Sequence, residues 1–230
     1  MVLVLAKSPV PGLAKTRLCP PASPSQAAAL ASAALLDTLD AVRTVPETVP
    51  MVAWTGDLAK AVNSEELSHK LDGTVKFQQQ GDLLGARIAA AHAEVACRAP
   101  GSPVLQIGMD TPQLTTRTLA DALAVLTGEP GPDAVLGPAD DGGWWALGLR
   151  DPRAAKLVEE VPMSRADTGD KTLDALRSGG LTVVLLDRLS DVDTAADALA
   201  VGEHCPPGSR FAAEVAAMDA VLRSGGAGSP

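Results

Sequence analysis

Short apolar runs alternate along the chain with segments of helical periodicity, and this alternation constrains the fold more than any other sequence feature. Runs rich in apolar and β-branched residues are predicted as strands at 2–5, 48–54, 74–77, 103–107, 134–136, 144–149 and 182–186. Most lack polar alternation, as is typical of parallel strands covered on both faces. Helices are predicted at 24–43, 57–69, 82–97, 115–127, 170–178, 194–203 and 208–223. We therefore expect an α/β protein of three layers, α/β/α, with a mostly parallel central sheet.

Size and charge restrict the classes of function. The 230 residues, 46% of them apolar, suit a single globular domain, which we place at 1–223 with a flexible tail at 224–230. A net charge of −9 disfavours a nucleic-acid partner. The apolar start is only a strand long and lacks a basic leader, so we predict no signal peptide and no membrane span. The three cysteines show no C-x-x-C spacing, which favours a cytoplasmic protein.

The loop after the first predicted strand is cationic. Residues 1–36 contain Lys7, Lys15 and Arg17 and no acidic residue. Arg17 can fork onto two phosphate oxygens, and a lysine supplies a point charge. The loop is not a P-loop, because Pro9 and Ala14 stand where that motif needs glycine. The cations therefore either bind phosphate groups or pair with acids on the surface.

Asp110 follows the predicted strand 103–107 through Gly108. Ligands of open α/β sheets bind at the carboxyl ends of the strands, and Mg²⁺ takes one or two carboxylates together with substrate phosphates. Asp110 is therefore a candidate metal ligand. The alternative is that it caps the helix predicted at 115–127.

An unusual stretch lies between two predicted strands. It holds two acids, two glycines and two indoles, in the order Asp140, Asp141, Gly142, Gly143, Trp144 and Trp145. Strand alternation sends the two indoles to opposite faces of the sheet, so one can border a ligand cavity while the other joins the core. We assign Trp145 to the core. A glycine-rich hairpin with core indoles is the alternative for the whole stretch.

Two further acids follow the predicted strand 182–186. Asp191 and Asp193 would point the same way from an extended segment and could complete a cation site with Asp110. The alternative is helix capping, since Thr194-x-x-Asp197 is nearly a capping box and Asp193 is itself a suitable N-cap.

Histidines and serines point to no further chemistry. His69, His92 and His204 fit no metal spacing, and we expect His69 and His92 on exposed helix faces. No serine stands in a G-x-S-x-G elbow, so neither a zinc site nor a hydrolase triad is predicted.

Five segments resemble, in order, the motifs of small glycosyltransferase-A-fold proteins described as nucleotide-diphospho-sugar transferases. They are A-K-S-P-V-P-G-L-A-K-T-R-L at 6–18, Q-G-D-L-L-G-A-R at 80–87, I-G-M-D-T-P at 107–112, G-P-A-D-D-G-G-W-W-A-L-G-L at 137–149 and D-V-D-T-A-A-D at 191–197. More distantly, the chain is similar to 2-phospho-lactate and molybdenum-cofactor guanylyltransferases. The resemblance implies the glycosyltransferase A type of fold.

The resemblance also implies roles for individual residues. A nucleotide site would be formed by Lys7, Pro11, Gly12, Lys15, Arg17, Asp82 and Arg87. Mg²⁺ or Mn²⁺ would bind Asp110 and, by analogy with the guanylyltransferases, Asp191 and Asp193. The acceptor would be bordered by Asp140, Asp141, Gly142, Gly143 and Trp144. Asp110, Lys15 and Asp141 would take part in catalysis.

Three hypotheses follow from the sequence. The first is a metal-dependent transferase that uses a nucleotide-diphospho-sugar and an unknown small acceptor. The second is a guanylyl- or cytidylyltransferase that moves a nucleotide from a nucleoside triphosphate to a phosphorylated small molecule. The third is a nucleotide-binding module without turnover. The chain departs from the resembled family at Trp144 and in the segment 161–168, near the expected acceptor, and therefore leaves the acceptor open.

Overall fold

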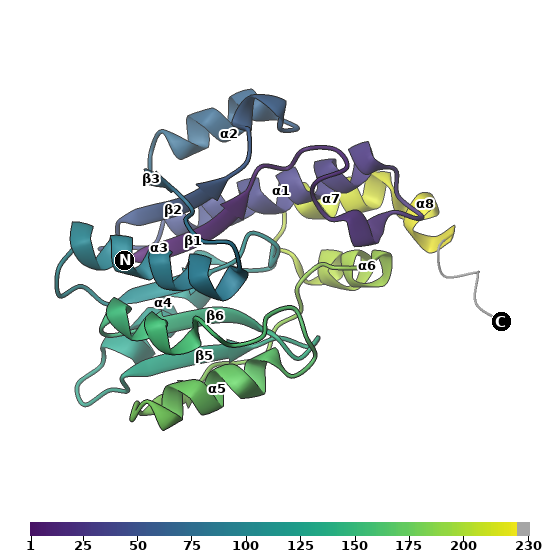
Figure 1. Cartoon of the computed structure of the whole chain (residues 1–230). Coiled ribbons are helices and arrows are strands. Elements are labelled where there is room, and N and C mark those ends of the chain that lie inside the picture. Colours follow the sequence, from purple (N-terminus) through teal and green to yellow (C-terminus); the bar gives the residue numbers. More distant parts are fainter. Residues whose placement is uncertain (225–230) are drawn as a thin grey trace.

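The computed structural model describes residues 1–224, and within them a seven-stranded sheet has helices on both faces (Figure 1). The strands are β1 (Val2–Lys7), β2 (Pro50–Thr55), β3 (Val75–Gln78), β4 (Val104–Ile107), β5 (Ala134–Pro138), β6 (Trp144–Leu149) and β7 (Val183–Leu185). They lie in the order β3-β2-β1-β4-β6-β5-β7. All neighbouring pairs are parallel except those that β6 makes with β4 and β5. The predicted α/β/α fold with a mostly parallel sheet is confirmed.

Strand β6 is antiparallel because the connection that precedes it is short. Residues 139–143 join β5 to β6, and a parallel connection would need a dozen residues or more. Gly142 adopts a φ of +86° in this turn, a conformation that favours glycine. The stretch therefore forms a glycine-rich hairpin, as in the alternative, but of its two indoles only Trp145 is buried in the core.

Side chains of β1 alternate between the two layers of helices. Val2 and Val4 point to the layer of α1 (Pro24–Arg43), α2 (Ser64–Leu71) and α4 (Thr116–Thr127). Leu3 points to the opposite layer, which contains α3 (Leu84–Arg98), the 3₁₀ helix η3 (Pro152–Val158) and α5 (Thr168–Ser178). Both faces of the strand are buried, which explains why its sequence is apolar without interruption.

The last three helices form a separate cluster beyond the carboxyl edge of the sheet (Figure 1). They are α6 (Ala195–His204), α7 (Arg210–Ala217) and α8 (Asp219–Ser224). Their buried side chains, among them Phe211, share a cluster with Leu18 of the 3₁₀ helix η1 (Thr16–Leu18) and with residues of α1. The cationic first loop is therefore packed against the C-terminal helices.

Helix α1 begins and ends where the sequence predicts. Ser23 is its N-cap and forms a capping box with Gln26, and Pro24 stands at the first helical position. The helix predicted at 57–69 is instead the 3₁₀ helix η2 (Leu58–Lys60) followed by α2. The helix predicted at 208–223 is divided into α7 and α8.

Some other predictions from the sequence differ from the structure. No element was predicted at η3. His92 was expected on an exposed face, but it is fully buried, and its Nε2 donates to Oε1 of Gln106 at 2.9 Å. Of the tail predicted to be flexible, Ser224 is the last residue of α8, and 225–230 lie outside the described residues.

Candidate functional site

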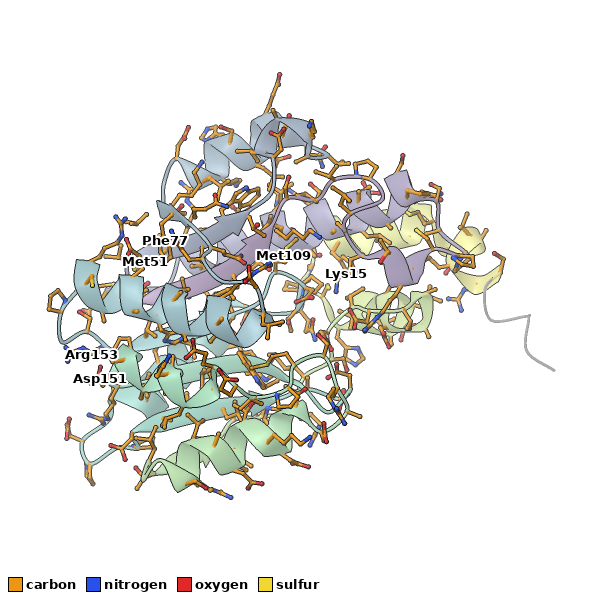
Figure 2. The ribbon with its side chains drawn as sticks, in the orientation of Figure 1. Lys15, Met51, Phe77, Met109, Asp151 and Arg153 are labelled. Atoms are coloured by element: carbon orange, nitrogen blue, oxygen red, sulfur yellow. The ribbon has the colours of Figure 1, made fainter. Side chains whose placement is uncertain are left out.

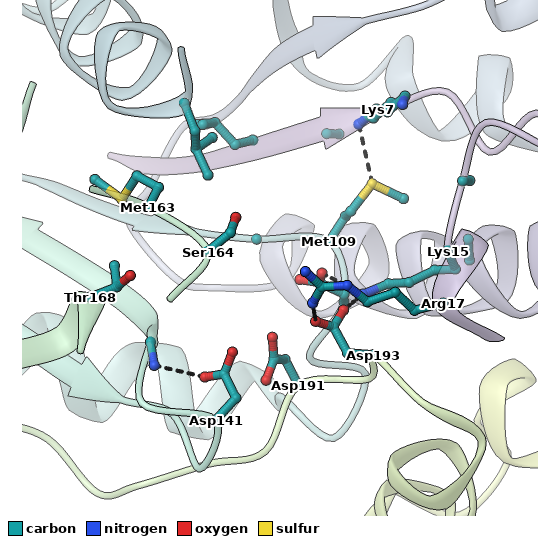
Figure 3. Close-up of a pocket in the computed structure, with 18 of the residues that line it drawn as sticks. Lys7, Lys15, Arg17, Met109, Asp141, Met163, Ser164, Thr168, Asp191 and Asp193 are labelled. Atoms are coloured by element: carbon teal, nitrogen blue, oxygen red, sulfur yellow. Dashed lines mark hydrogen bonds and ion pairs between the residues drawn. The ribbon is translucent and has the colours of Figure 1, made fainter. Parts of the chain in front are cut away.

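A cavity of about 820 Å³ lies at the carboxyl ends of β1 and β4. Its walls come from the first loop, the residues after β4, the β5–β6 turn, the segment 163–168 before α5 and the segment 191–197. In Figure 2, Lys15 and Met109 lie on this side of the molecule, and Asp151 and Arg153 lie at the opposite end. Figure 3 shows the labelled side chains converging on the cavity. Ligands of open α/β sheets bind at this edge.

Lys15 enters the cavity and pairs with two acids from distant parts of the chain (Figure 3). Its Nζ lies 2.7 Å from Oδ2 of Asp110 and 2.9 Å from Oδ1 of Asp193. Arg17 adds a contact of 2.7 Å to the other oxygen of Asp193. Burial by itself would lower the pKa of Lys15, but the two carboxylates raise it above its ordinary value. Lys15 is therefore a fixed positive charge within a group of acids.

Three carboxylates meet at this point. One oxygen from each of Asp110, Asp191 and Asp193 lies within 4.8 Å of the others. Burial, together with the nearby charges of Asp110, Asp141 and Asp193, raises the pKa of Asp191 to about 6. A set of oxygen donors that repel one another fits a hard divalent cation such as Mg²⁺ or Mn²⁺.

The backbone holds these acids in place. The amide of Val192 donates to the carbonyl of Asp110 at 3.0 Å, which ties the segment 191–193 to the end of β4. Thr194 and Asp197 form the capping box that begins α6. Thr194 caps α6, so the carboxylate of Asp193 is available to the cations. Burial by itself would raise the pKa of Asp193, but Lys15 and Arg17 lower it below its ordinary value.

The cavity's other end is formed by the β5–β6 turn and α5. Asp141, Gly143 and Trp144 line the cavity, whereas Asp140 and Gly142 do not. Asp141 accepts a hydrogen bond from the amide of Gly143 at 2.7 Å (Figure 3). The carboxylate of Asp140 instead accepts from Ser190 and lies 4.0 Å from Arg188.

The two tryptophans lie on opposite faces of β6, as predicted. Trp144 borders the cavity, and its Nε1 donates to Oγ1 of Thr172 at 3.2 Å. Trp145 is 4% exposed and packs in the core, with its Nε1 donating to the carbonyl of Asp187 at 2.9 Å. The assignment of Trp145 to the core is confirmed.

Some of the residues that were expected to bind the nucleotide line the cavity, and others do not. Lys7 lines it while donating from Nζ to the carbonyl of Leu13 at 2.7 Å, and Arg87 lines it as well. Pro11, Gly12 and Asp82 are not lining residues. Asp82 contributes its backbone, because its carbonyl accepts a hydrogen bond of 3.4 Å from Arg87.

Two glutamines that the sequence analysis passed over line the cavity as well. Gln79 follows β3, and Gln106 lies within β4, where it is 3% exposed. Gln106 is a buried polar residue in an apolar strand, and Gln79 directly follows the mixed polar and apolar strand β3. The position of Gln106 was a usable signal, because a polar side chain buried in a sheet needs a specific partner.

No helix within residues 1–224 combines the length and the apolar character needed to cross a membrane.

Comparison with known proteins finds relatives in two transferase groups. The phosphoenolpyruvate guanylyltransferase of Nocardia farcinica is 35% identical over 141 residues, which make up 60% of this chain and 60% of that protein. A crystal structure from Desulfovibrio desulfuricans G20, assigned provisionally as a nucleotide-diphospho-sugar transferase, is 26% identical. It superposes with a TM-score of 0.83 over 97% of this chain and 96% of its own. A cytidylyltransferase from Leptospira borgpetersenii shares the fold, with a TM-score of 0.57 at 10% identity over 96% and 95% of the two chains.

The fold is that of the nucleotide-dependent transferases, and the chain is similar both to a guanylyltransferase and to a structure provisionally assigned as a nucleotide-diphospho-sugar transferase. The family model of DUF2064, described as an uncharacterized protein conserved in bacteria, matches residues 38–165. The match covers more than half of the chain, which therefore belongs to this family. Asp110 and Asp141 lie inside the matched region, and Lys15, Asp191 and Asp193 lie outside it.

Proposed function

We propose that the protein is a divalent-metal-dependent nucleotidyltransferase that transfers a nucleotide from a nucleoside triphosphate to an anionic small acceptor. The observation that carries the proposal is the meeting of Lys15 with Asp110 and Asp193 in one cavity. A polyphosphate needs cationic side chains, and a metal that bridges it to the protein needs carboxylates. The guanylyltransferase relative supports nucleotidyl transfer.

Charge in the cavity supports the need for a metal. Five cationic side chains line it, namely Lys7, Lys15, Arg17, Arg87 and Arg165. Five carboxylates oppose them, namely Asp110, Asp141, Asp191, Asp193 and Asp197. The formal charge of the lining is therefore balanced before any ligand enters, so a triphosphate would bring unbalanced negative charge. Divalent cations held by the acids would supply the missing positive charge.

Each group in the cavity has a role in this proposal. Asp110, Asp191 and Asp193 would hold the divalent ion, which when bound would supply positive charge beside the phosphates. Lys15 and Arg17 exchange their contacts with carboxylates for contacts with phosphate oxygens. An oxygen of the acceptor attacks the α-phosphorus, the bond from that phosphorus to the bridging oxygen breaks, and pyrophosphate leaves. Trp144 and Arg165 border the place of the acceptor.

A second candidate is sugar transfer from a nucleotide-diphospho-sugar. It is favoured by the Desulfovibrio structure, which matches nearly the whole chain at 26% identity. In this reaction the acceptor would attack the anomeric carbon and a nucleoside diphosphate would leave. The same cations and carboxylates would serve both reactions, because each places negative charge on the departing phosphates.

The two reactions release different products, and this decides between them. The protein is incubated with Mn²⁺, a panel of phosphorylated and carboxylated acceptors, and either nucleoside triphosphates or nucleotide-diphospho-sugars. Acceptor-dependent pyrophosphate supports nucleotidyl transfer, and acceptor-dependent nucleoside diphosphate supports sugar transfer. Binding without either product leaves a nucleotide-binding module, and absence of Mn²⁺-dependent nucleotide binding overturns the proposal.

A matched pair of variants tests the site itself. Asp110→Asn should abolish metal-dependent nucleotide binding and turnover. Asp121→Asn changes an acid of α4 whose side chain is 71% exposed and which is not a lining residue, and it should change neither. If the two variants show equal metal-dependent nucleotide binding and equal turnover, Asp110 is not part of the site.

A further inference from the structure

Gln106 of β4 and His92 of α3 form a buried polar pair beside the cavity. His92 is fully buried, Gln106 is 3% exposed, and Nε2 of the imidazole lies 2.9 Å from Oε1 of the amide. Burial lowers the pKa of His92 to about 4, so the ring carries a single hydrogen at neutral pH. Within residues 1–224, Nδ1 of the ring has no hydrogen-bond partner. The position of that one hydrogen therefore decides how the pair is oriented.

The unpartnered Nδ1 fixes the direction of the Gln106 amide. With Oε1 toward the ring, Nε2 of His92 carries the hydrogen, and Nδ1 is a buried acceptor without a partner. With the amide rotated by 180°, Nε2 of the ring would have to accept, and Nδ1 would become a buried donor without a partner. Buried N–H groups without a partner are rarer in proteins than buried acceptors without one. The ring therefore holds Oε1 of Gln106, and Nε2 of Gln106 points away from the ring.

Nε2 of Gln106 is accessible from the cavity. Of the buried side-chain nitrogen and oxygen atoms in residues 1–224, two lack a hydrogen-bond partner, namely Nδ1 of His92 and Oε1 of Gln113. Nε2 of Gln106 has no partner in this part of the chain either, but it is not one of the two buried atoms, so it retains accessible surface. Gln106 lines the cavity, and this surface faces it. Gln106 thus presents amide N–H groups to the cavity.

Gln106 lies on the side of the cavity proposed for the acceptor. The residue opposite it in β6, Leu147, shares an apolar cluster with Ile88, Trp144 and Met163. The last three line the cavity. In the proposed function Trp144 borders the acceptor, and Figure 3 shows Met163 across the cavity from the cationic first loop. A donor with apolar neighbours makes a stronger hydrogen bond than one in water.

We infer that Gln106 binds the acceptor by donating a hydrogen bond from Nε2 to one of its oxygens, and that His92 is the positioning residue that directs this donor into the cavity. The inference rests on the proposed function, in which Arg165 and the divalent ion meet the charged groups of the acceptor. Gln106 adds an uncharged contact at a second point. The acceptor is therefore an anionic molecule that carries an oxygen for Gln106 besides the oxygen that attacks the α-phosphorus.

Steady-state kinetics test the contact. The acceptors are phosphoenolpyruvate, 2-phospholactate, 3-phosphoglycerate and glucose 1-phosphate, each with Mn²⁺ and a nucleoside triphosphate. Gln106→Met removes the donor and keeps a side chain of similar length. It should raise the KM for the acceptor about tenfold, while kcat and the affinity for the nucleotide stay within about threefold of the wild-type values. Gln78→Met is the control, because Gln78 is an exposed glutamine of β3 that does not line the cavity, and it should leave this KM unchanged.

The role of His92 needs a readout that a loss of packing would not produce. His92→Leu removes the group that orients the amide and should raise the KM for the acceptor about threefold or more. His92→Gln again offers a donor to Oε1 of Gln106 and should recover most of this loss. In the Gln106→Met background, His92→Leu should change the KM by less than about twofold, because no amide is left to orient. An equal effect of His92→Leu in both backgrounds overturns the positioning role.

The remaining outcomes separate this inference from the proposed function. An unchanged acceptor KM in folded Gln106→Met overturns the inference, while nucleotide binding and the proposed function stand. Nuclear magnetic resonance of the wild-type protein gives a result even if that variant does not fold. The side-chain amide hydrogens of Gln106 should exchange with water within seconds at alkaline pH, and protection for hours overturns the inference. If the wild-type protein releases neither product with any of these acceptors, the proposed function fails and the inference fails with it.

Discussion

Lys15 and Asp110 are 95 positions apart in the sequence, and Nζ of the one lies 2.7 Å from Oδ2 of the other. The same Nζ lies 2.9 Å from Asp193, so an ammonium group stands among the carboxylates proposed to hold a metal. A divalent ion and this ammonium would compete for the same oxygens. Nucleotide phosphates would resolve the competition by giving Lys15 another partner.

Lys15→Met should therefore have opposite effects on two ligands. Without nucleotide, Mn²⁺ should bind more tightly than in the wild-type protein, because the competing positive charge is gone. Nucleotide affinity should fall about tenfold, and the loss should shrink at high salt. Mn²⁺ binding is followed by electron paramagnetic resonance and nucleotide binding by calorimetry.

Lys60→Met is the control for this experiment, since Lys60 is 74% exposed and pairs with its neighbour Asp57. Weaker Mn²⁺ binding in Lys15→Met would contradict the competition between Lys15 and the metal.

Asp191→Asn should stabilise the metal-free protein. The pKa of Asp191 is raised to about 6 from 3.8, so the folded state binds more protons than the unfolded state between these values. Stability from this group is present below pH 3.8 and is lost as the pH rises through 6. At pH 8 the variant should gain about 1 kcal/mol in free energy of unfolding, a figure reduced for solvent screening of a partly exposed group.

Urea unfolding in EDTA at pH 5 and pH 8 measures the effect of Asp191→Asn. Added Mn²⁺ should stabilise the wild-type protein more than the variant. A variant that is less stable at pH 8 would show that the three acids do not repel one another in the folded protein.

His92 should make the protein sensitive to acid. Burial lowers its pKa to about 4 from 6.5, against a smaller opposite effect of the hydrogen bond with Gln106. The unfolded state then binds more protons between these values, so the free energy of unfolding falls as the pH drops from 6.5 to 4. The loss is about 3 kcal/mol over this window.

The glutamine of His92→Gln cannot bind that proton, so the free energy of unfolding of the variant should depend less on pH. Urea unfolding at half-unit steps of pH measures this dependence. His69→Gln changes an exposed histidine of α2 and should leave the slope as it is. If the free energy of unfolding of His92→Gln falls with pH as steeply as that of the wild-type protein, another group titrates between pH 4 and 6.5.

Gly142→Ala should be far more damaging than Gly12→Ala. Both glycines have positive φ, +86° and +76°. A Cβ at 142 would lie 1.9 Å from the carbonyl oxygen of Ala166, whereas a Cβ at 12 would meet no atom within 4 Å. Gly12→Ala should cost about 1–2 kcal/mol in backbone strain. Gly142→Ala should cost several kcal/mol or displace the segment 163–168.

Thermal unfolding measures the stability of both glycine variants, and the KM for the acceptor reports on the segment 163–168. Similar losses of stability in the two variants would show that the segment 163–168 moves away from a Cβ at position 142 at little cost in free energy.

Local signals in the sequence were enough to predict most elements. The capping box at Ser23 and the proline that follows it define the start of α1, and uninterrupted apolar runs define the strands. Asp110 was identifiable as a site candidate because it comes three residues after the end of such a run. These features depend on neighbours in the sequence, which pattern reading captures.

Features that depend on distant partners were not predictable in this way. His92 is polar and was expected to be exposed, and it is buried because Gln106 of β4 satisfies one of its nitrogens. Thr194, not Asp193, caps α6, and the carboxylate of Asp193 instead pairs with Lys15, 178 positions away. The side-chain amide of Gln79 donates to carbonyl groups of two other strands, which the sequence around it does not specify.

The packing of Leu18 with Val192 and the C-terminal helices has a consequence for synthesis of the protein. The loop carrying Lys15 and helix α1 leave the ribosome early, but the other packing partners of Leu18 are translated among the last residues. Until those residues emerge, Leu18 can pack against α1 but not against the C-terminal helices, and Lys15 has no Asp193 to pair with. The first loop therefore reaches its final packing only after the C-terminal helices have been made.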